Sequence, residues 1–268
     1  MTRRVKALRV AAIAAVLGTV LAGCGSPTSG GGDAGGPAAA SSDGDRTLTV
    51  YAAASLADTF DQLGKDFEEA HPGTTVALNY GGSSGLVQQL TEGAPADVFA
   101  SADQKNMTKL TDAQLNDGEP TIFATNTLTI VVPADNPADI TSFEDLRKGG
   151  VKLVTCASEV PCGSATQTVE KVNGVTLEPV SEEGSVTDVL GKVTSGQADA
   201  GIVYVTDAKS AGDKVTTVGL PKADQAINKY PIVTLKDAKN TELAAEFEKL
   251  VTGPQGQEGL KKAGFGAP

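Results

Sequence analysis

Tryptophan is absent from the 268-residue sequence, and histidine occurs only once, as His71. Without Trp, and with only four Tyr and seven Phe, the chain offers little aromatic surface on which bases or sugars could stack. Positive charge is also scarce: the formal net charge is -11, and an acidic surface repels nucleic acid and gives no long-range attraction to an anion. We therefore expect no nucleic-acid partner, and any bound anion must be held by local dipoles.

Cysteine is scarce as well, and the positions of the three cysteines indicate the compartment. Cys24 ends the sequence Leu-Ala-Gly-Cys after a basic start and an apolar run, 10–21, that is too short to span a bilayer comfortably. This arrangement resembles a bacterial lipoprotein signal, which predicts a signal peptide at 1–23 and acylation of the Cys24 thiol; an ordinary secretory signal is the alternative. Residues 24–46 are rich in Gly, Ser, Ala and Pro and are predicted to form a flexible tether.

The other two cysteines, Cys156 and Cys162, lie close together in a chain that we expect to be exported. Neither a histidine nor a further cysteine completes a metal site with them, so the spacing favours a disulfide over a metal pair. We expect no cofactor and no free metal cation. A loop this small implies a stabilisation of roughly 2 kcal/mol from the disulfide.

The stretch Tyr-Gly-Gly-Ser-Ser-Gly at 80–85 follows a predicted strand and precedes apolar residues at helical spacing. A helix start beside serine hydroxyls offers unpaired N–H groups to an anion. The stretch also fits the Gly-x-Ser-x-Gly elbow of hydrolases, but that serine needs a histidine base that follows it, whereas His71 precedes it at a predicted helix end. We predict a donor-only anion site without catalytic residues. A Ser83 hydrolase, or a turn in which Ser83 merely caps a helix, is the alternative.

Two predicted strands, 47–54 and 74–80, are each followed by a serine, Ser55 or Ser83, at a helix start. If the strands are parallel neighbours, both serines lie at their carboxyl ends, where open α/β sheets bind ligands. We interpret Ser55 as an N-cap. Asp97 and Asp103 are expected to have turn and cap roles rather than catalytic ones.

A second α/β unit follows, with strands predicted at 151–155 and 198–205 and helices near Gly163 and from Ser185. Extended runs near Leu128 and Ile232 bracket this unit, which predicts two chain crossings. We therefore expect an α/β fold with lobe 1 formed by 47–127 plus 229–268 and lobe 2 by 128–228. A ligand held between such lobes couples binding to closure.

Several segments together resemble one family: Val-Tyr-Ala-Ala-Ala-Ser-Leu (50–56), Gly-Ala-Pro-Ala-Asp-Val-Phe (93–99) and Gly-Ile-Val-Tyr (201–204). Their order and spacing are similar to those of the bacterial molybdate-binding proteins, which serve ABC importers. The likeness runs from about residue 48 to 265. It implies a type II periplasmic-binding-protein fold, a clamshell with a two-crossing hinge.

The resemblance also implies a set of ligand-binding residues for a tetrahedral oxyanion. Ser55 and Ser83 would each donate through the hydroxyl and the backbone N–H, Cys162 and Val186 through the backbone N–H, and Tyr204 through its hydroxyl. Without the resemblance, we would interpret Tyr204 as a buried strand tyrosine whose hydroxyl is satisfied locally. Cys162 departs from the family, in which a small residue such as alanine is usual.

The function implied is capture of molybdate, and of tungstate, outside the cytoplasm and delivery to the permease and ATPase of an ABC importer. We expect a monomer without enzymatic activity, anchored to the cell membrane through its lipid. Donor-only sites suit molybdate and tungstate because these carry no proton at neutral pH, whereas much phosphate does and needs an acceptor. Another tetrahedral oxyanion, such as sulfate, is the alternative ligand.

Overall fold

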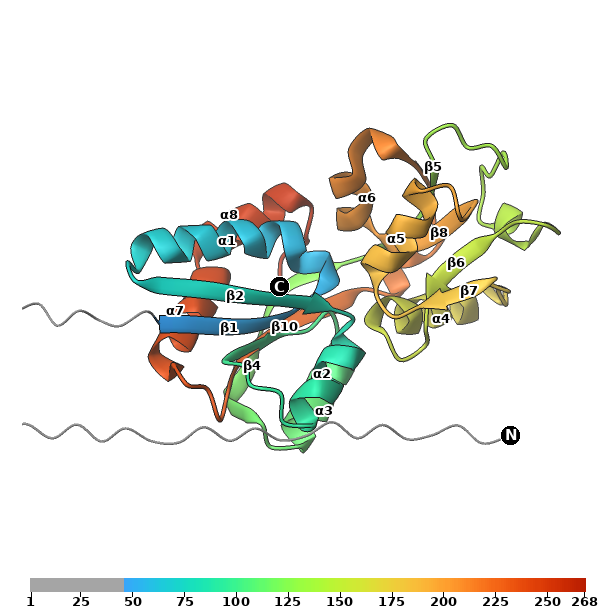
Figure 1. Ribbon diagram of the computed structural model, residues 1–268. Coiled ribbons are helices and arrows are strands. Elements are labelled where there is room, and N and C mark those ends of the chain that lie inside the picture. The colour runs from blue at the N-terminus through green and yellow to red at the C-terminus, as the bar shows by residue number, and fades with distance from the viewer. Residues whose placement is uncertain (1–45) are drawn as a thin grey trace, which may run out of the picture. The chain divides into compact units, whose positions relative to one another are not determined.

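The computed structural model describes residues 46–268. Cys24, the predicted signal peptide at 1–23 and, except for residue 46, the predicted tether at 24–46 lie outside the described residues. The described chain contains two five-stranded sheets, with strand orders β2-β1-β3-β10-β4 and β7-β6-β8-β5-β9 (Figure 1). The expected α/β architecture of two lobes is confirmed.

Each sheet belongs to one lobe. Lobe 1 contains β1 (Arg46–Ala53), β2 (Thr74–Gly81), β3 (Val98–Ala100), β4 (Asn116–Asn126) and β10 (Asn228–Leu235), with α1 (Ala57–Ala70), α2 (Ser83–Thr91), α3 (Gln104–Asp112), α7 (Thr241–Thr252) and α8 (Pro254–Ala263). Lobe 2 contains β5 (Leu128–Pro133), β6 (Leu153–Cys156), β7 (Ser181–Glu183), β8 (Ala200–Tyr204) and β9 (Val215–Val218), with α4 (Pro161–Asn173), α5 (Val186–Thr194) and α6 (Val205–Ala211). The 3-10 helices are η1 (Ala54–Leu56), η2 (Glu144–Arg147), η3 (Gly212–Lys214) and η4 (Ala223–Gln225).

Parallel pairing places the helix starts of each lobe at one sheet edge. In lobe 1, β1 pairs in parallel with β2 and with β3, so the condition under which Ser55 and Ser83 lie at the same sheet edge is met. In lobe 2, β6 pairs in parallel with β7 and β8. Because parallel strands share the edge at which they end, the segments that follow β1 and β2, and those that follow β6, β7 and β8, meet at the carboxyl edges of their sheets.

The chain changes sheet at two neighbouring positions. β4 ends at Asn126 and β5 begins at Leu128 in the other sheet, while the return path enters lobe 1 at the start of β10. β4 and β10 are antiparallel, and their register pairs Asn126 with Asn228. The two crossings therefore run side by side, the arrangement of a two-strand hinge.

Lobe 1 has a separate apolar core on each face of its sheet. Helix α1 contributes Phe60, Leu63 and Phe67, one helical face, to the core that also contains the α7 and α8 residues. Phe60 packs edge-on against Phe247 of α7, with 5.8 Å between ring centroids. Burial of each such side chain contributes roughly 1.5–3 kcal/mol. Helices α2 and α3 cover the opposite face (Figure 1).

The secondary structure differs from the sequence-based expectation at a few points. The segment that begins at Ser142, whose sequence resembles a capped helix start, forms only the short helix η2, and strands β7 and β9 were not anticipated. Within residues 46–268, no helix combines the length and the apolar character needed to cross a membrane.

Candidate functional site

A small cavity between the lobes is lined by all five residues that the sequence predicted as ligand-binding: Ser55, Ser83, Cys162, Val186 and Tyr204. The space open to the centre of a water-sized sphere is about 10 Å³. Roughly 10–15 Å³ by this measure is needed to hold one water molecule, so the space leaves no room for a sugar or a peptide. Among the described residues that line it, the others are Ala53, Ala54, Gly81, Gly82, Ala102, Val160 and Pro161, so no charged side chain lines the cavity.

Three helices begin at this cavity. Ser83 is the first residue of α2, Cys162 is in the first turn of α4 after Pro161, and Val186 is the first residue of α5. The first N–H groups of a helix have no partner within it and carry partial positive charge, so three helix starts make a site for an anion. Ser185 caps α5 by accepting the N–H of Asp188.

The Ser83 hydroxyl lies at the start of α2 but does not cap it. No side chain caps α2, and Ser83 Oγ accepts the backbone N–H of Ala102 at 3.0 Å. The alternative of a mere helix cap is therefore wrong. The reason is tertiary: the segment after β3 brings an N–H group to the hydroxyl oxygen, and because the oxygen only accepts in this bond, the hydroxyl proton remains available for a ligand.

The Ser55 hydroxyl likewise does not cap a helix. Ser55 lies inside η1, and α1 begins at Ala57 without a side-chain cap, so the N-cap interpretation was wrong. Ser55 Oγ instead forms a hydrogen bond with the Tyr230 hydroxyl at 3.0 Å. The 3-10 turn moves the N-cap position one residue onward, to Leu56, and leaves Ser55 at the cavity.

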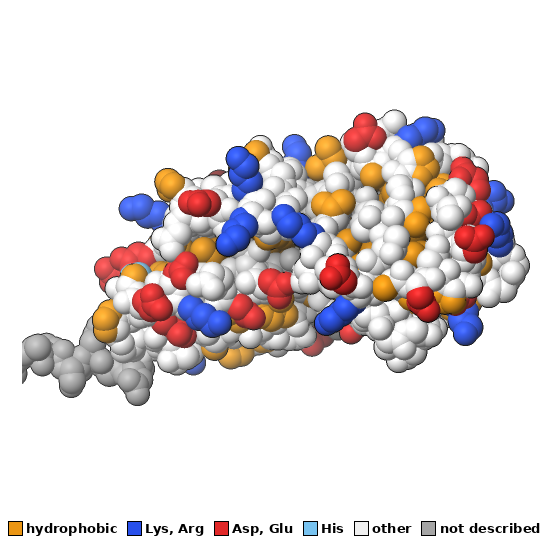
Figure 2. Space-filling model, turned by 90° about the horizontal axis from the view of Figure 1, so that it is seen from above, with side chains coloured by type: hydrophobic (Ala, Val, Ile, Leu, Met, Phe, Trp, Pro, Cys, Tyr) orange, Lys and Arg blue, Asp and Glu red, His pale blue; other side chains and the backbone are white. Residues whose placement is uncertain are grey.

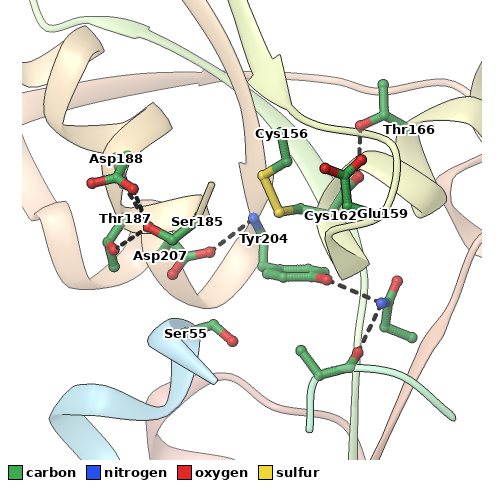
Figure 3. The surroundings of a disulfide bond; sticks show 12 residues. Ser55, Cys156, Glu159, Cys162, Thr166, Ser185, Thr187, Asp188, Tyr204 and Asp207 are labelled. Carbon is green, nitrogen blue, oxygen red and sulfur yellow. Dashed lines mark hydrogen bonds between the residues drawn. A yellow bond between two sulfur atoms is a disulfide. The ribbon is translucent and has the colours of Figure 1, made fainter. Parts of the chain in front are cut away.

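Tyr204 ends β8 with its ring almost completely buried, 1% exposed. Its hydroxyl oxygen accepts a hydrogen bond from Asn228 Nδ2 at 3.0 Å. Figure 3 shows its ring reaching into the space between Ser55 and the Cys156–Cys162 disulfide. Burial raises the pKa of Tyr204 well above its usual value, and the same cause raises that of Tyr230, so both phenols keep their protons at physiological pH.

Three polar residues next to the cavity were missed by sequence reasoning: Asn126, Asn228 and Tyr230. Tyr230 bonds the Ser55 hydroxyl, Asn228 bonds the Tyr204 hydroxyl and Asn126 bonds Tyr230. The partners lie 175, 24 and 104 residues apart in the sequence. No local motif marks them, because their role depends on the pairing of the crossing strands β4 and β10.

The acidic and histidine candidates have structural roles. Asp103 caps α3 by accepting the Asn106 N–H, and Asp97 accepts N–H groups of Thr49 and Lys239, which confirms the cap and turn interpretation. His71 is the C-cap of α1, as predicted, and its ring bonds the Phe67 carbonyl and Glu246. The Ser83 hydrolase alternative thus has no histidine base among the hydrogen-bond partners of Ser83. No cluster of His, Cys, Asp and Glu that could hold a metal ion occurs in residues 46–268.

The expected disulfide is present. Cys156 at the end of β6 is bonded to Cys162 in the first turn of α4, with 5.7 Å between the two Cα atoms (Figure 3). It therefore ties one of the three helix starts to the sheet of lobe 2.

The lobes touch at the rim of the cavity. A Cβ atom added to Gly82 would lie 2.1 Å from the carbonyl oxygen of Gly184, so the two backbones are in direct contact. Asn106 Nδ2 also donates to the Glu159 carbonyl of lobe 2 at 3.3 Å. Backbone groups of both lobes thus meet beside the cavity. The outer face in Figure 2 carries acidic and basic side chains interspersed, so attraction of an anion falls to the local dipoles of the site.

A buried carboxyl group beside the site predicts a pH dependence of stability. Asp207, in the first turn of α6, accepts the Tyr204 N–H at 2.9 Å, and burial raises the pKa of Asp207 to about 7. A carboxyl group whose pKa rises on folding stabilises the folded state fully below its unfolded value, near 4, and this contribution is lost as the pH rises through its folded value. We expect Asp207→Asn to be a few kcal/mol more stable than the wild type at about pH 7.5 and similar to it at about pH 4. Urea unfolding at both pH values measures this, and the same difference at both would contradict it.

Comparison with known proteins gives consistent results. Residues 48–266 match the family of bacterial extracellular solute-binding proteins. The chain is 47% identical over 253 residues to the molybdate-binding protein ModA of Mycobacterium tuberculosis, with 94% of each chain covered. The periplasmic molybdate-binding protein of Azotobacter vinelandii has a similar structure, with a TM-score of 0.71 and 24% identity over 82% of this chain and 99% of that one. The sulfate-binding protein SubI of M. tuberculosis gives a TM-score of 0.67 and 23% identity over 82% and 86%. These two structural likenesses concern the fold alone.

Proposed function

The chain belongs to the bacterial extracellular solute-binding proteins, and within them to the molybdate-binding proteins, and from this premise we propose that it captures molybdate, and also tungstate, in the cavity between its lobes. The observation that carries the proposal is that Ser55, Ser83, Cys162, Val186 and Tyr204 all line one small cavity without a charged side chain. In this proposal the first two donate through hydroxyl and N–H, the next two through N–H, and Tyr204 through its hydroxyl.

The energetics of a dianion explain why both lobes are required. An anion that leaves water loses a large hydration energy, and each hydrogen bond to a charged group returns only about 1.5–3 kcal/mol. Many donors must therefore converge, and only the closed form brings the donors of lobe 1 and lobe 2 to the same space. The open form is expected to bind weakly, which couples capture to closure.

The chemistry of the donors supports selection against protonated anions. The Ser83 and Tyr204 hydroxyl oxygens each accept a hydrogen bond from the protein, which leaves their protons for donation to a ligand and reduces their capacity to accept from one. Molybdate and tungstate present only acceptors, whereas a protonated phosphate needs an acceptor in return. Sulfate is also unprotonated, and SubI has the same fold; a sulfate-binding protein is therefore the second candidate.

The place of the protein in transport follows from its amino-terminal sequence and its family. We propose that Cys24 carries a lipid that anchors the protein to the outside of the cell membrane and that residues 24–46 act as a tether. A tethered carrier stays at high effective concentration near the permease and ATPase of its importer. The proposed protein is a monomer, and its role is binding and delivery without turnover.

A panel of oxyanions tests the function. We expect molybdate and tungstate at about 1,000 times their dissociation constant to add roughly 4 kcal/mol to the free energy of unfolding, which for a domain of this size raises Tm by roughly 10 °C. Sulfate and phosphate at the same concentration are expected to leave Tm almost unchanged. A larger shift with sulfate than with molybdate would make the sulfate alternative the function. Covalent labelling of Ser83 by a fluorophosphonate probe would support a hydrolase instead.

Removal of the disulfide is a second test, because Cys162 supplies one of the proposed N–H donors. The double variant Cys156→Ser, Cys162→Ser is expected to lose roughly 2 kcal/mol of unfolding free energy and to bind molybdate more weakly, since the first turn of α4 is then less fixed. Denaturant unfolding and calorimetric titration measure the two effects, and the double variant avoids any reaction of a thiol reductant with the ligand. Equal affinity in variant and wild type would show that the disulfide contributes to stability but not to molybdate binding.

A further inference from the structure

The two crossing strands each carry a buried asparagine beside the cavity. Asn126 ends β4 and Asn228 begins β10, and the antiparallel register places them opposite each other. They are 3% and 7% exposed. A buried amide must find partners for its donors and its acceptor, so the direction in which each amide points is set by the groups around it.

The orientation of the Asn228 amide is fixed by a carbonyl group. Its Nδ2 donates to the backbone carbonyl of Ala102 at 2.8 Å, and a carbonyl oxygen can only accept, so the NH₂ group must face it. The second hydrogen of the same NH₂ group is directed to the Tyr204 hydroxyl oxygen at 3.0 Å. Asn228 therefore links a lobe 1 backbone group to a lobe 2 side chain, and it meets Tyr204 as a donor.

The consequence concerns the hydroxyl proton of Tyr204. Its oxygen accepts the Asn228 hydrogen, so its own proton must point elsewhere: to the Tyr230 hydroxyl, to which Tyr204 also has a hydrogen bond, or, when a ligand is present, into the cavity that Tyr204 lines. The same Ala102 peptide that accepts from Asn228 donates its N–H to Ser83 Oγ. One chain of hydrogen bonds thus provides a donor to the Ser83 hydroxyl in lobe 1 and a donor to the Tyr204 hydroxyl in lobe 2.

Asn126 forms a separate set of contacts. Its Oδ1 accepts the Thr127 N–H at 3.0 Å, and its Nδ2 donates to Thr206 Oγ1 at 2.8 Å and to the Tyr230 hydroxyl at 3.4 Å. Tyr230 in turn bonds Ser55 and Tyr204, so Asn126 reaches Tyr204 only through Tyr230. Asn126 is therefore a control one contact further away: a buried asparagine of the same strand pair that does not itself bond the Tyr204 hydroxyl among the contacts of residues 46–268.

We propose that Asn228 is a positioning residue for oxyanion binding, which holds the Tyr204 hydroxyl with its proton directed at the ligand. The proposal rests on the proposed function and adds a residue that does not itself line the cavity. Its energetic contribution passes through the Tyr204 hydroxyl, so it must disappear when that hydroxyl is removed. This is the property that separates positioning from a general role in hinge stability.

A double-mutant cycle tests the proposal, with molybdate affinity measured by calorimetric titration. We expect Asn228→Ala to weaken binding about tenfold in the wild type and less than about twofold in a Tyr204→Phe background, because coupling requires the shared hydroxyl. In a Ser55→Ala background the tenfold loss should persist. For Asn126→Ala, which reaches Tyr204 only through Tyr230, the loss of affinity should change less between the two backgrounds than the loss for Asn228→Ala.

A second variant and a spectroscopic readout complete the experiment. Asn228→Asp keeps the side-chain shape. Its loss of molybdate affinity must also be smaller in the Tyr204→Phe background. Repulsion between the new carboxylate and the dianion weakens binding in both backgrounds, so a difference between them comes from the Tyr204 hydroxyl. Because the chain lacks Trp, near-UV absorption reports its four Tyr; molybdate should produce a difference spectrum that Tyr204→Phe abolishes and Asn228→Ala reduces. Equal losses in both backgrounds would overturn the role of Asn228 while the function stands. Failure of the wild type to bind molybdate would overturn the proposed function and this inference with it.

Discussion

Replacement of Gly82 with alanine is expected to weaken molybdate binding at least a hundredfold while the lobes stay folded. The added Cβ would lie 2.1 Å from the Gly184 carbonyl oxygen, a distance that backbone atoms cannot accommodate without moving the lobes apart. Gly82 has φ -66° and ψ 135°, which alanine adopts freely, so the clash arises only between lobes. If fewer than about one in a hundred molecules can adopt the closed form, the apparent affinity for molybdate falls at least about a hundredfold.

The matched control is alanine on the other side of the same contact. A Cβ at Gly184 would meet nothing within 4 Å, so Gly184→Ala should bind molybdate within about threefold of the wild type. Titration calorimetry gives the affinities, and small-angle scattering should detect compaction on ligand addition in Gly184→Ala but not in Gly82→Ala. Wild-type affinity in Gly82→Ala would mean that binding does not need the closed contact.

The helix starts of the site could be predicted from sequence because their signals are local. A glycine turn after a strand, Pro161 at the first position of α4 and Ser185 before an amphipathic run each mark a helix start within a few residues. The family resemblance added Tyr204, which no local pattern distinguishes from an ordinary buried strand tyrosine. Pro161 and Tyr204 line the cavity, as does Val186, the residue after Ser185.

The partners of the hydroxyl groups could not be predicted in the same way. Ser55 was interpreted as an N-cap, and a cap was one alternative for Ser83, but their hydroxyls bond Tyr230 and the Ala102 N–H, which are 175 and 19 residues away along the chain. Such contacts follow from strand order and register, and the antiparallel return of β10 between β3 and β4 has no sequence signal of its own. The same holds for Asn126 and Asn228, because their contacts depend on the pairing of two strands about 100 residues apart.

Replacement of Ser83 with alanine is expected to weaken molybdate binding by about 10- to 150-fold. The lost hydroxyl is a hydrogen-bond donor to a charged ligand, and such a bond contributes about 1.5–3 kcal/mol, where each 1.4 kcal/mol corresponds to tenfold. The substitution also removes the acceptor of the Ala102 N–H in a position where Ser83 is 0% exposed. An unpaired buried donor costs about 1–3 kcal/mol, so the unliganded variant should also lose stability by that amount.

Ser84, the next residue of the same motif, separates the two effects of Ser83. It lies in the same first turn of α2 but does not line the cavity, so Ser84→Ala should leave both affinity and stability within about 0.5 kcal/mol of the wild type. Calorimetric titration measures affinity, and denaturant unfolding without ligand measures stability. A stability loss in Ser83→Ala without any loss of affinity would show that the hydroxyl only supports Ala102. The ligand would then be held by backbone N–H groups alone at this helix start, because the Ser83 N–H survives the substitution unchanged.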